Sequence, residues 1–245
     1  MENSSLPDQL CLAVIPARGG SKRIPSKNIR DLCGKPIITY TIDAAMQSSI
    51  FSRIIVSTDS DKIANLARRF GAEVPFMRDA GLSDDYTPVS LVTLDALQRL
   101  DLDGIRFRYV AQLMPNCPLR TAEDIQNSYR QFVDTKADSQ ISVTRYGWLN
   151  PWWAMTLNAK YHLSSIFPEQ TGKRSQDLPE LFCPTGAIWW AKVEVLRQEK
   201  TFHIPSRTGW EIPWQRAIDI DTEYDWQLAE LLIQGHQFKS QPECQ

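Results

Sequence analysis

The chain has 245 residues, 42 % of them hydrophobic, and a formal net charge of −2. This length and composition suit one large α/β domain, or a domain with an appendage, that buries a sizeable core. No apolar run reaches the roughly 18–20 residues that span a membrane, and a pI of about 6.0 argues against nucleic acid as the main partner.

Strand and helix signals alternate along most of the chain. Apolar runs predict buried strands at residues 12–15, 53–57, 73–76, 109–114, 140–144, 187–191 and 217–220. Helical periodicity and capping residues predict helices at residues 36–47, 60–69, 88–100, 121–133 and 222–233. Pro36 suits the first helical position, Asp59 or Ser60 caps the second helix, and Thr121 and Asp124 have the spacing of a capping box. The alternation predicts βαβ units and a mainly parallel sheet.

The regular pattern breaks between about residues 147 and 181. Prolines and the Trp152–Trp153 pair interrupt this stretch, and it shows no long helical period. We interpret it as an inserted arm of a single domain that covers residues 10–235. Five scattered cysteines and a polar N-terminus without a signal-peptide pattern favour free thiols in a cytoplasmic protein.

A basic loop directly follows the first predicted strand. It contains the adjacent Gly19 and Gly20 and four cationic side chains, those of Arg18, Lys22, Arg23 and Lys27. Paired glycines let the backbone adopt positive φ and turn consecutive N–H groups toward an anion, and the cations add charge. The loop therefore suits a polyphosphate, the alternative being a solvated turn. It is neither a Walker A loop nor a dinucleotide fingerprint, because neither glycine spacing is present.

A carboxylate pair lies near the end of the chain. In the predicted strand 217–220 and just beyond it, Asp219 and Asp221 would share one face, since side chains i and i+2 point the same way. Two carboxylates on one face suit Mg²⁺, which accepts a few oxygen ligands and leaves room for phosphate oxygens. Alternatively, Asp221 or Thr222 only caps the last helix. Both this pair and the basic loop follow strands, and together they suit transfer at a nucleotide phosphorus.

These stretches resemble the acylneuraminate cytidylyltransferase family, the CMP-sialic acid synthetases. The matching segments are IPARGGSK (15–22), KN (27–28), GKP (34–36), IIVSTD (54–59), PLR (118–120) and DIDTE (219–223). The resemblance implies an α/β, Rossmann-like nucleotidyltransferase fold with a mainly parallel sheet and helices on both faces. It also implies a homodimer in which the arm at 147–181 reaches the partner's sugar site.

The resemblance also implies roles for individual residues. Arg18, Ser21, Lys27 and Asn28, with Gly19 and Gly20, would hold the CTP triphosphate, and Arg78 and the Ser83–Asp85 turn would lie near cytosine and ribose. Asp219 and Asp221 would bind Mg²⁺ and, with Arg18 and Lys27, form the catalytic set. Met114, Asn116, Arg174 and Gln176 would contact the acidic sugar.

Some segments are closer to the pseudaminic-acid branch: KRIP (22–25), GAEVPF (71–76), RSQDL (174–178) and DW (225–226). Met114 replaces a sugar-facing glutamine of the sialic-acid branch, and Cys183 replaces an arginine. We therefore expect a cytidylyltransferase that joins CMP from CTP to the anomeric hydroxyl of a nine-carbon 2-keto sugar acid of sialic, pseudaminic or legionaminic type. The alternatives are a CMP-Kdo-type synthetase, another sugar nucleotidyltransferase, and a non-catalytic nucleotide-binding homologue.

Overall fold

A six-stranded sheet forms the centre of the molecule. The structure, a computed structural model, describes residues 10–84, 86–102, 104 and 106–239. The strand order is β10-β6-β9-β5-β1-β4, with β1 Cys11–Pro16, β4 Arg53–Ser57, β5 Tyr109–Gln112, β6 Ser139–Arg145, β9 Phe182–Lys192 and β10 Thr208–Glu211. Neighbouring strands pair in parallel except at β9, which runs antiparallel to both β5 and β6. The predicted mainly parallel α/β sheet is confirmed.

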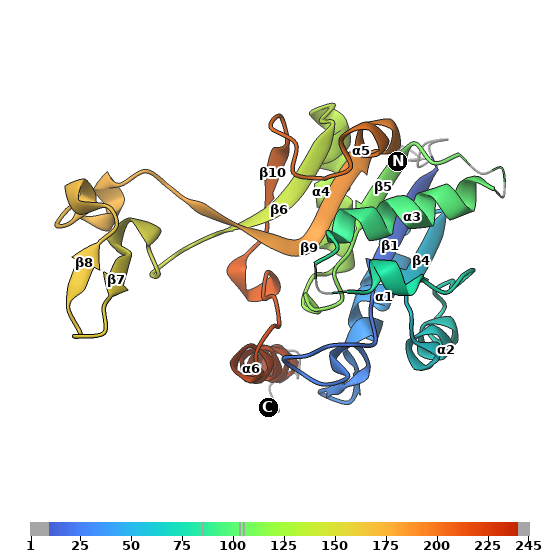
Figure 1. Cartoon of the computed structure of the whole chain (residues 1–245), viewed down its shortest axis with the longest axis horizontal. Helices are drawn as coiled ribbons and strands as arrows, with labels where there is room; N and C mark the ends of the chain where they lie inside the picture. The colour runs from blue at the N-terminus through green and yellow to red at the C-terminus, as the bar shows by residue number, and fades with distance from the viewer. Residues whose placement is uncertain (1–9, 85, 103, 105, 240–245) are drawn as a thin grey trace, which may run out of the picture.

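Helices cover both faces of this sheet (Figure 1). They are α1 Ile37–Ser48, α2 Asp61–Arg69, α3 Val89–Asp101, α4 Ala122–Asp134, α5 Val193–Glu199 and α6 Glu223–Lys239. Successive residues of β1 point to opposite faces of the sheet. Ala13 belongs to the core cluster with α1, α2 and α4, and Val14 belongs to the cluster with α3 and α5. On the first side the fully buried Trp190 stacks on Phe51 and Phe132. A third cluster packs α6 against the segment of β2 Asp31–Leu32 and β3 Lys35–Pro36.

The predicted capping box at α4 is confirmed. The Thr121 hydroxyl accepts from the Asp124 N–H at 3.1 Å, and the Asp124 carboxylate accepts from the Thr121 N–H at 2.9 Å. Pro36 is placed one position earlier than predicted, at the N-cap of α1. Five of the seven predicted strands, those at 12–15, 53–57, 109–114, 140–144 and 187–191, overlap β1, β4, β5, β6 and β9. Strand β10 has no counterpart in the prediction.

Two predicted strands are wrong. Residues 73–76 form only a single bridge from Glu73 to Ile55, because Pro75 has no N–H with which to continue a ladder. Residues 217–220 form no strand either. The Ile220 N–H instead donates to the Asn116 carbonyl at 2.8 Å, and the Ile220 carbonyl accepts from Lys27 Nζ at 2.6 Å. Side-chain and loop partners thus replace the strand ladder here.

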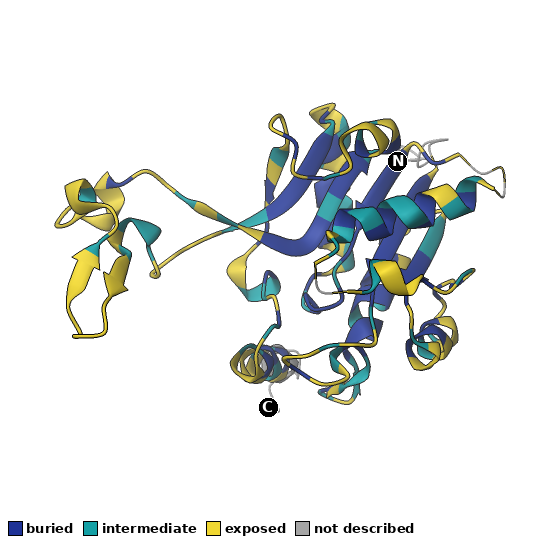
Figure 2. Ribbon diagram, viewed as in Figure 1, coloured by how far each residue is buried: buried dark blue, intermediate teal, exposed yellow. Residues whose placement is uncertain are grey.

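The predicted arm projects away from the sheet (Figure 1). It carries a short hairpin of β7 Met155–Leu157 and β8 Leu163–Ser165. Most of its residues are exposed (Figure 2), and they include large apolar side chains: Trp148, Leu149, Trp153, Met155, Leu157, Tyr161, Leu163, Ile166 and Phe167. None of the helices in the described part of the chain has the length and apolarity that crossing a bilayer needs.

Candidate nucleotide and metal site

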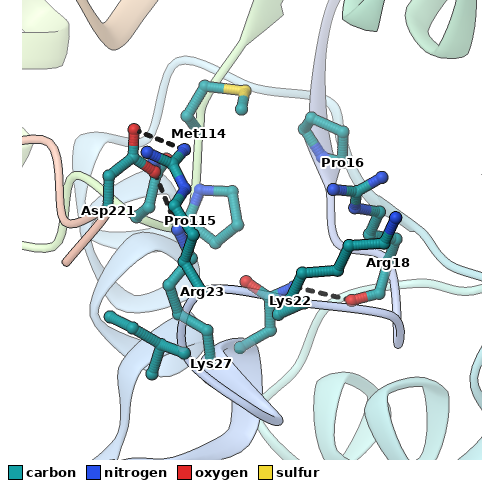
Figure 3. A pocket seen from close by; sticks show the side chains of 12 residues that line it. Pro16, Arg18, Lys22, Arg23, Lys27, Met114, Pro115 and Asp221 are labelled. Carbon is teal, nitrogen blue, oxygen red and sulfur yellow. Dashed lines mark hydrogen bonds and ion pairs between the residues drawn. The ribbon is translucent and has the colours of Figure 1, made fainter. Parts of the chain in front are cut away.

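The carboxyl ends of the parallel strands β1, β4 and β5 meet at one edge of the sheet, and a cavity of about 440 Å³ opens there. Its walls are the basic loop (18–28), the turn Met114–Asn116 that follows β5, and Asp221 (Figure 3). In open parallel sheets this edge is where ligands bind. The structure therefore brings together the two stretches that the sequence singled out, although they lie almost 200 positions apart.

Three hydrogen bonds that involve backbone groups at the start of the basic loop hold it in place. The Ala17 N–H donates to the Ser57 carbonyl at 2.9 Å, which continues the pairing of β1 with β4. The buried Asn28 side chain donates to the Arg18 carbonyl at 2.9 Å. The Gly19 N–H donates to the Asp59 carboxylate at 2.8 Å. These bonds fix the loop before any ligand arrives, while Arg18 and Lys22 point along one wall of the cavity (Figure 3).

The predicted reason for the two glycines is wrong. Neither Gly19 nor Gly20 has a positive φ. Instead, a Cβ at position 19 would lie 3.1 Å from the Ser60 Cβ, whereas a Cβ at position 20 would meet nothing within 4 Å. Gly19 is therefore required by close approach to the start of α2. Asp59 is no helix cap either, since Ser60 occupies that position without a side-chain bond and the Asp59 carboxylate holds the loop.

Asp221 faces the basic loop across the cavity. Its carboxylate pairs with Arg23 at 2.9 Å and with Lys27 at 3.2 Å, as Figure 3 shows. Lys27 also donates to the Ile220 carbonyl at 2.6 Å, so it ties the loop to the segment that carries both carboxylates. This cross-link places cations and carboxylates side by side, as transfer at a charged phosphate needs.

The side chain of Asp221 does not cap α6, which was the alternative role predicted for it. Thr222 and Asp225 cap this helix themselves. The Thr222 hydroxyl accepts from the Asp225 N–H at 3.3 Å, and the Asp225 carboxylate accepts from the Thr222 N–H at 2.7 Å and from the Asp221 N–H at 3.0 Å. The Asp221 side chain is left to face the cavity.

Asp219 sits beside Asp221 in a more crowded place. Although more than a third of the residue is accessible to solvent, surrounding protein atoms reduce its hydration, and this loss together with the Asp221 charge raises the pKa of its carboxyl to about 6. It remains mostly ionised at neutral pH. The Asn116 amide donates to it, which leaves the buried Asn116 Oδ1 with no hydrogen-bond partner.

These groups form an oxygen-rich set that suits Mg²⁺. The two carboxylates of Asp219 and Asp221 are hard oxygen ligands, and Mg²⁺ completes its shell with water and substrate phosphates. Among the described residues, no group of three or more histidine, cysteine or acidic side chains is placed to hold a metal ion by itself. The fit is thus to a metal shared with a bound phosphate rather than to a closed structural site.

A second cavity of about 240 Å³ adjoins the first, and Arg18 and Met114 line both. Arg78 lines it with a side chain that is 3 % exposed. Its Nε donates to the Ser83 hydroxyl at 3.1 Å, and its buried Nη2 has no hydrogen-bond partner. Burial lowers the pKa of this guanidinium. That this cavity takes the nucleoside stays a prediction, and Asp85 of the predicted turn lies outside the described residues.

Arg174 and Gln176 lie on the arm that projects from the sheet (Figure 1), at the short helix Ser175–Asp177. Neither lines the two cavities described above. The exposed Arg174 pairs with Asp177, at 2.7 Å from its Nε and 3.1 Å from its Nη2. Their contact with a sugar stays a prediction that requires a second chain. The sequence reasoning also overlooked Asp59, which follows β4 at the same sheet edge as the other site residues; the rule that ligands bind at these strand ends would have found it.

The chain belongs to the cytidylyltransferase family, whose model matches residues 12–173. It is 32 % identical over 221 residues to pseudaminic acid cytidylyltransferase of Campylobacter jejuni, covering 90 % of this chain and 95 % of that protein. It is 36 % identical over 234 residues to CMP-N,N'-diacetyllegionaminic acid synthase of Legionella pneumophila, covering 92 % and 97 %. The predicted family resemblance is confirmed.

Solved structures show the same fold at low identity. A CMP:2-keto-3-deoxy-manno-octonic acid synthetase complexed with CTP matches with a TM-score of 0.69 at 16 % identity, over 93 % of this chain and 100 % of that chain. A 4-diphosphocytidyl-2C-methyl-D-erythritol synthase from Anaerococcus prevotii matches with a TM-score of 0.63 at 14 % identity, over 92 % and 99 %. The predicted nucleotidyltransferase fold is thereby confirmed.

Proposed function

We propose that this protein transfers CMP from CTP to the anomeric hydroxyl of a nine-carbon 2-keto sugar acid, of sialic, pseudaminic or legionaminic type, and releases pyrophosphate. One observation carries the proposal: a cavity of nucleotide size in which a pre-formed cationic loop faces Asp221. The named relatives act in the same chemistry, one on pseudaminic acid and one forming CMP-N,N'-diacetyllegionaminic acid.

The basic loop would receive the triphosphate. Arg18 and Lys22 line one wall and Lys27 lies opposite (Figure 3), so negative charge that grows on the departing pyrophosphate meets fixed cations. Because the loop is held by Asn28 and Asp59 in advance, little reorganisation accompanies binding. The adjoining cavity at Arg78 would take the nucleoside. The sugar would lie against Met114 and Asn116, with its hydroxyl directed at the α-phosphorus.

Asp219 and Asp221 would hold Mg²⁺, with Asp219 oriented by the Asn116 amide that donates to it. When bound, the ion would supply positive charge at the reacting phosphate. Lys27 and Arg23, which neutralise Asp221 in this structure, are placed to turn to phosphate oxygens instead. We also propose that the protein acts in the cytoplasm, where CTP is made.

A homodimer would complete the site. The arm exposes a row of large apolar side chains, including Trp148, Leu157 and Leu163, which is costly in water and typical of an interface. Arg174 and Gln176 lie on the same arm. In a pair of chains each arm would bring them to the partner's cavity, where Arg174 would bind the sugar carboxylate through a charge-assisted pair.

Pyrophosphate release from CTP tests this function. We expect release with at least one of neuraminic, legionaminic and pseudaminic acids, dependent on Mg²⁺. Release only with the eight-carbon acid Kdo would favour a CMP-Kdo-type synthetase, and release only with a hexose phosphate and UTP or CTP would favour another sugar nucleotidyltransferase. CTP binding without release across the whole panel would indicate a non-catalytic homologue.

A further inference from the structure

Arg120 is a buried cation for which the proposed reaction assigns no role. It follows the turn after β5 and precedes α4, and it is 3 % exposed. Its Nη2 donates to the Met114 carbonyl, while its buried Nε and Nη1 have no hydrogen-bond partner. The Cys117 thiol lies beside it, but burial raises the pKa of that thiol, so it is neutral. In the described part of the chain no carboxylate forms an ion pair with Arg120.

A buried guanidinium without a direct counter-ion is costly, so the carboxylates that act on it from a distance matter. Two do so, Asp219 and Asp124. Asp124 is already paired with Arg216, at 2.7 and 2.8 Å. Among the described residues no cation forms an ion pair with Asp219, and its charge is influenced by Lys27 and, to a smaller extent, by Arg120.

Arg120 also anchors the turn that carries Asn116. The Met114 carbonyl accepts from both Arg120 Nη2 and the Cys117 N–H, the latter at 3.3 Å. Within this closed turn the Asn116 carbonyl accepts from the Ile220 N–H at 2.8 Å, and the Asn116 amide donates to Asp219. A single series of bonds therefore runs from Arg120 through the turn to the carboxylate segment.

We propose that Arg120 is a positioning residue: its buried guanidinium holds the Met114–Cys117 turn and, through Asn116 in that turn, the position of Asp219, so that the wall opposite the basic loop keeps its shape during the reaction. This role rests on the function proposed above. Arg120 itself lines neither of the two cavities that would hold CTP and reaches them only through the turn that carries Met114. Its loss should therefore impair turnover and sugar binding far more than CTP binding.

Three variants test this role. Arg120→Met removes the charge at similar length, and Arg120→Lys keeps the charge but loses the planar fork. Arg216→Met is the matched control, because Arg216 contacts the same end of α4 through Asp124 and lies outside the cavities. For each protein we would measure kcat and KM for pyrophosphate release, the CTP Kd by calorimetry without sugar, and the melting temperature.

We expect Arg120→Met to lower kcat about a hundredfold while the CTP Kd changes less than about threefold, and Arg120→Lys to recover about tenfold of that loss. Arg216→Met should lower the melting temperature and leave kcat within about twofold. Unchanged kcat in Arg120→Met, or parallel loss of kcat and CTP binding in Arg120→Lys, would overturn the role. If Arg120→Met does not fold, Arg120→Lys tests the role by the same comparison of kcat with the CTP Kd. A wild-type protein inactive with every sugar would instead overturn the function, and this role with it.

Discussion

The basic loop and the arm are both irregular, charged segments, but the chain holds them in opposite ways. The loop and the residue before it are fixed to the sheet edge by hydrogen bonds that they donate to Ser57, Asp59 and Ile220. The arm bonds mainly to itself, as Arg174 does to Asp177. Most of its residues are exposed (Figure 2), and large apolar side chains are among them. In the proposed function, one chain would complete the nucleotide half of the site, and the arm of a second chain would complete the sugar half.

This difference separates two kinds of prediction. Changes in the loop and its facing carboxylates should act within one chain and be explained by contacts already present. Changes in the arm should act only through a neighbour. Variants of the two regions, singly and mixed, therefore test whether the loop acts within one chain and the arm acts on a neighbouring chain.

The largest effect should come from the carboxylate pair. Asp221→Asn removes a charge from the cavity wall and Asp219→Asn removes one beside it, and neither residue belongs to the core. We therefore expect turnover to fall about 10²–10³-fold while the melting temperature stays within a few degrees. Asp138→Asn is the control, since Asp138 pairs with Lys192 away from the cavity. Near-normal turnover in both site variants would refute the metal assignment.

Arg18→Ala should weaken CTP far more than CMP. Arg18 lines the cavity of the basic loop, and a lost charge-assisted bond to phosphate costs about 1.5–3 kcal/mol, or roughly 10–100-fold in affinity. Calorimetric titration with both nucleotides measures the difference. Arg18 also lines the cavity at Arg78 and donates to the Asp84 carbonyl at 2.7 Å. Equal weakening of CMP and CTP would therefore place its main contact at the nucleoside.

The sequence predicted the parts of the site whose chemistry is local. Asp221 and the cations of the basic loop are readable because charge, glycine and strand signals lie within a few residues. The sequence-based predictions were wrong where tertiary contacts determine the local structure. The segment at 217–220 looks like a strand, yet its backbone bonds to Asn116 and Lys27, and Asp59 reads as a helix cap until β4 is placed beside β1. Likewise, no pattern near Arg120 indicates that its guanidinium is buried.

A mixing experiment tests whether the arm serves a neighbour. Arg174→Ala should raise the sugar KM about tenfold and leave the CTP Kd unchanged, because the guanidinium would bind the sugar carboxylate. Mixed with Asp219→Asn, it should regain activity if arms cross, since each mixed dimer then holds one site with both changes and one with neither. Random exchange would restore about a quarter of all sites.

The mixing experiment needs a control that shows that the two variants exchange subunits. Differently tagged chains that co-purify after mixing show that mixed dimers formed. If they form and activity does not return, the sugar site is built within one chain, and the contrast between loop and arm drawn above does not hold.

The smallest effect should separate the two adjacent glycines of the loop. A Cβ at position 19 would press on the Ser60 Cβ at 3.1 Å, whereas position 20 is open. Gly19→Ala should therefore shift the loop and weaken CTP about three- to tenfold, while Gly20→Ala should stay within about twofold. Because the obstruction is one side-chain carbon, adding Ser60→Gly to Gly19→Ala should restore most of the affinity. If Gly19→Ala and Gly20→Ala weaken CTP equally, the loop needs glycine for backbone freedom after all, and its anchoring to α2 is not what shapes the phosphate site.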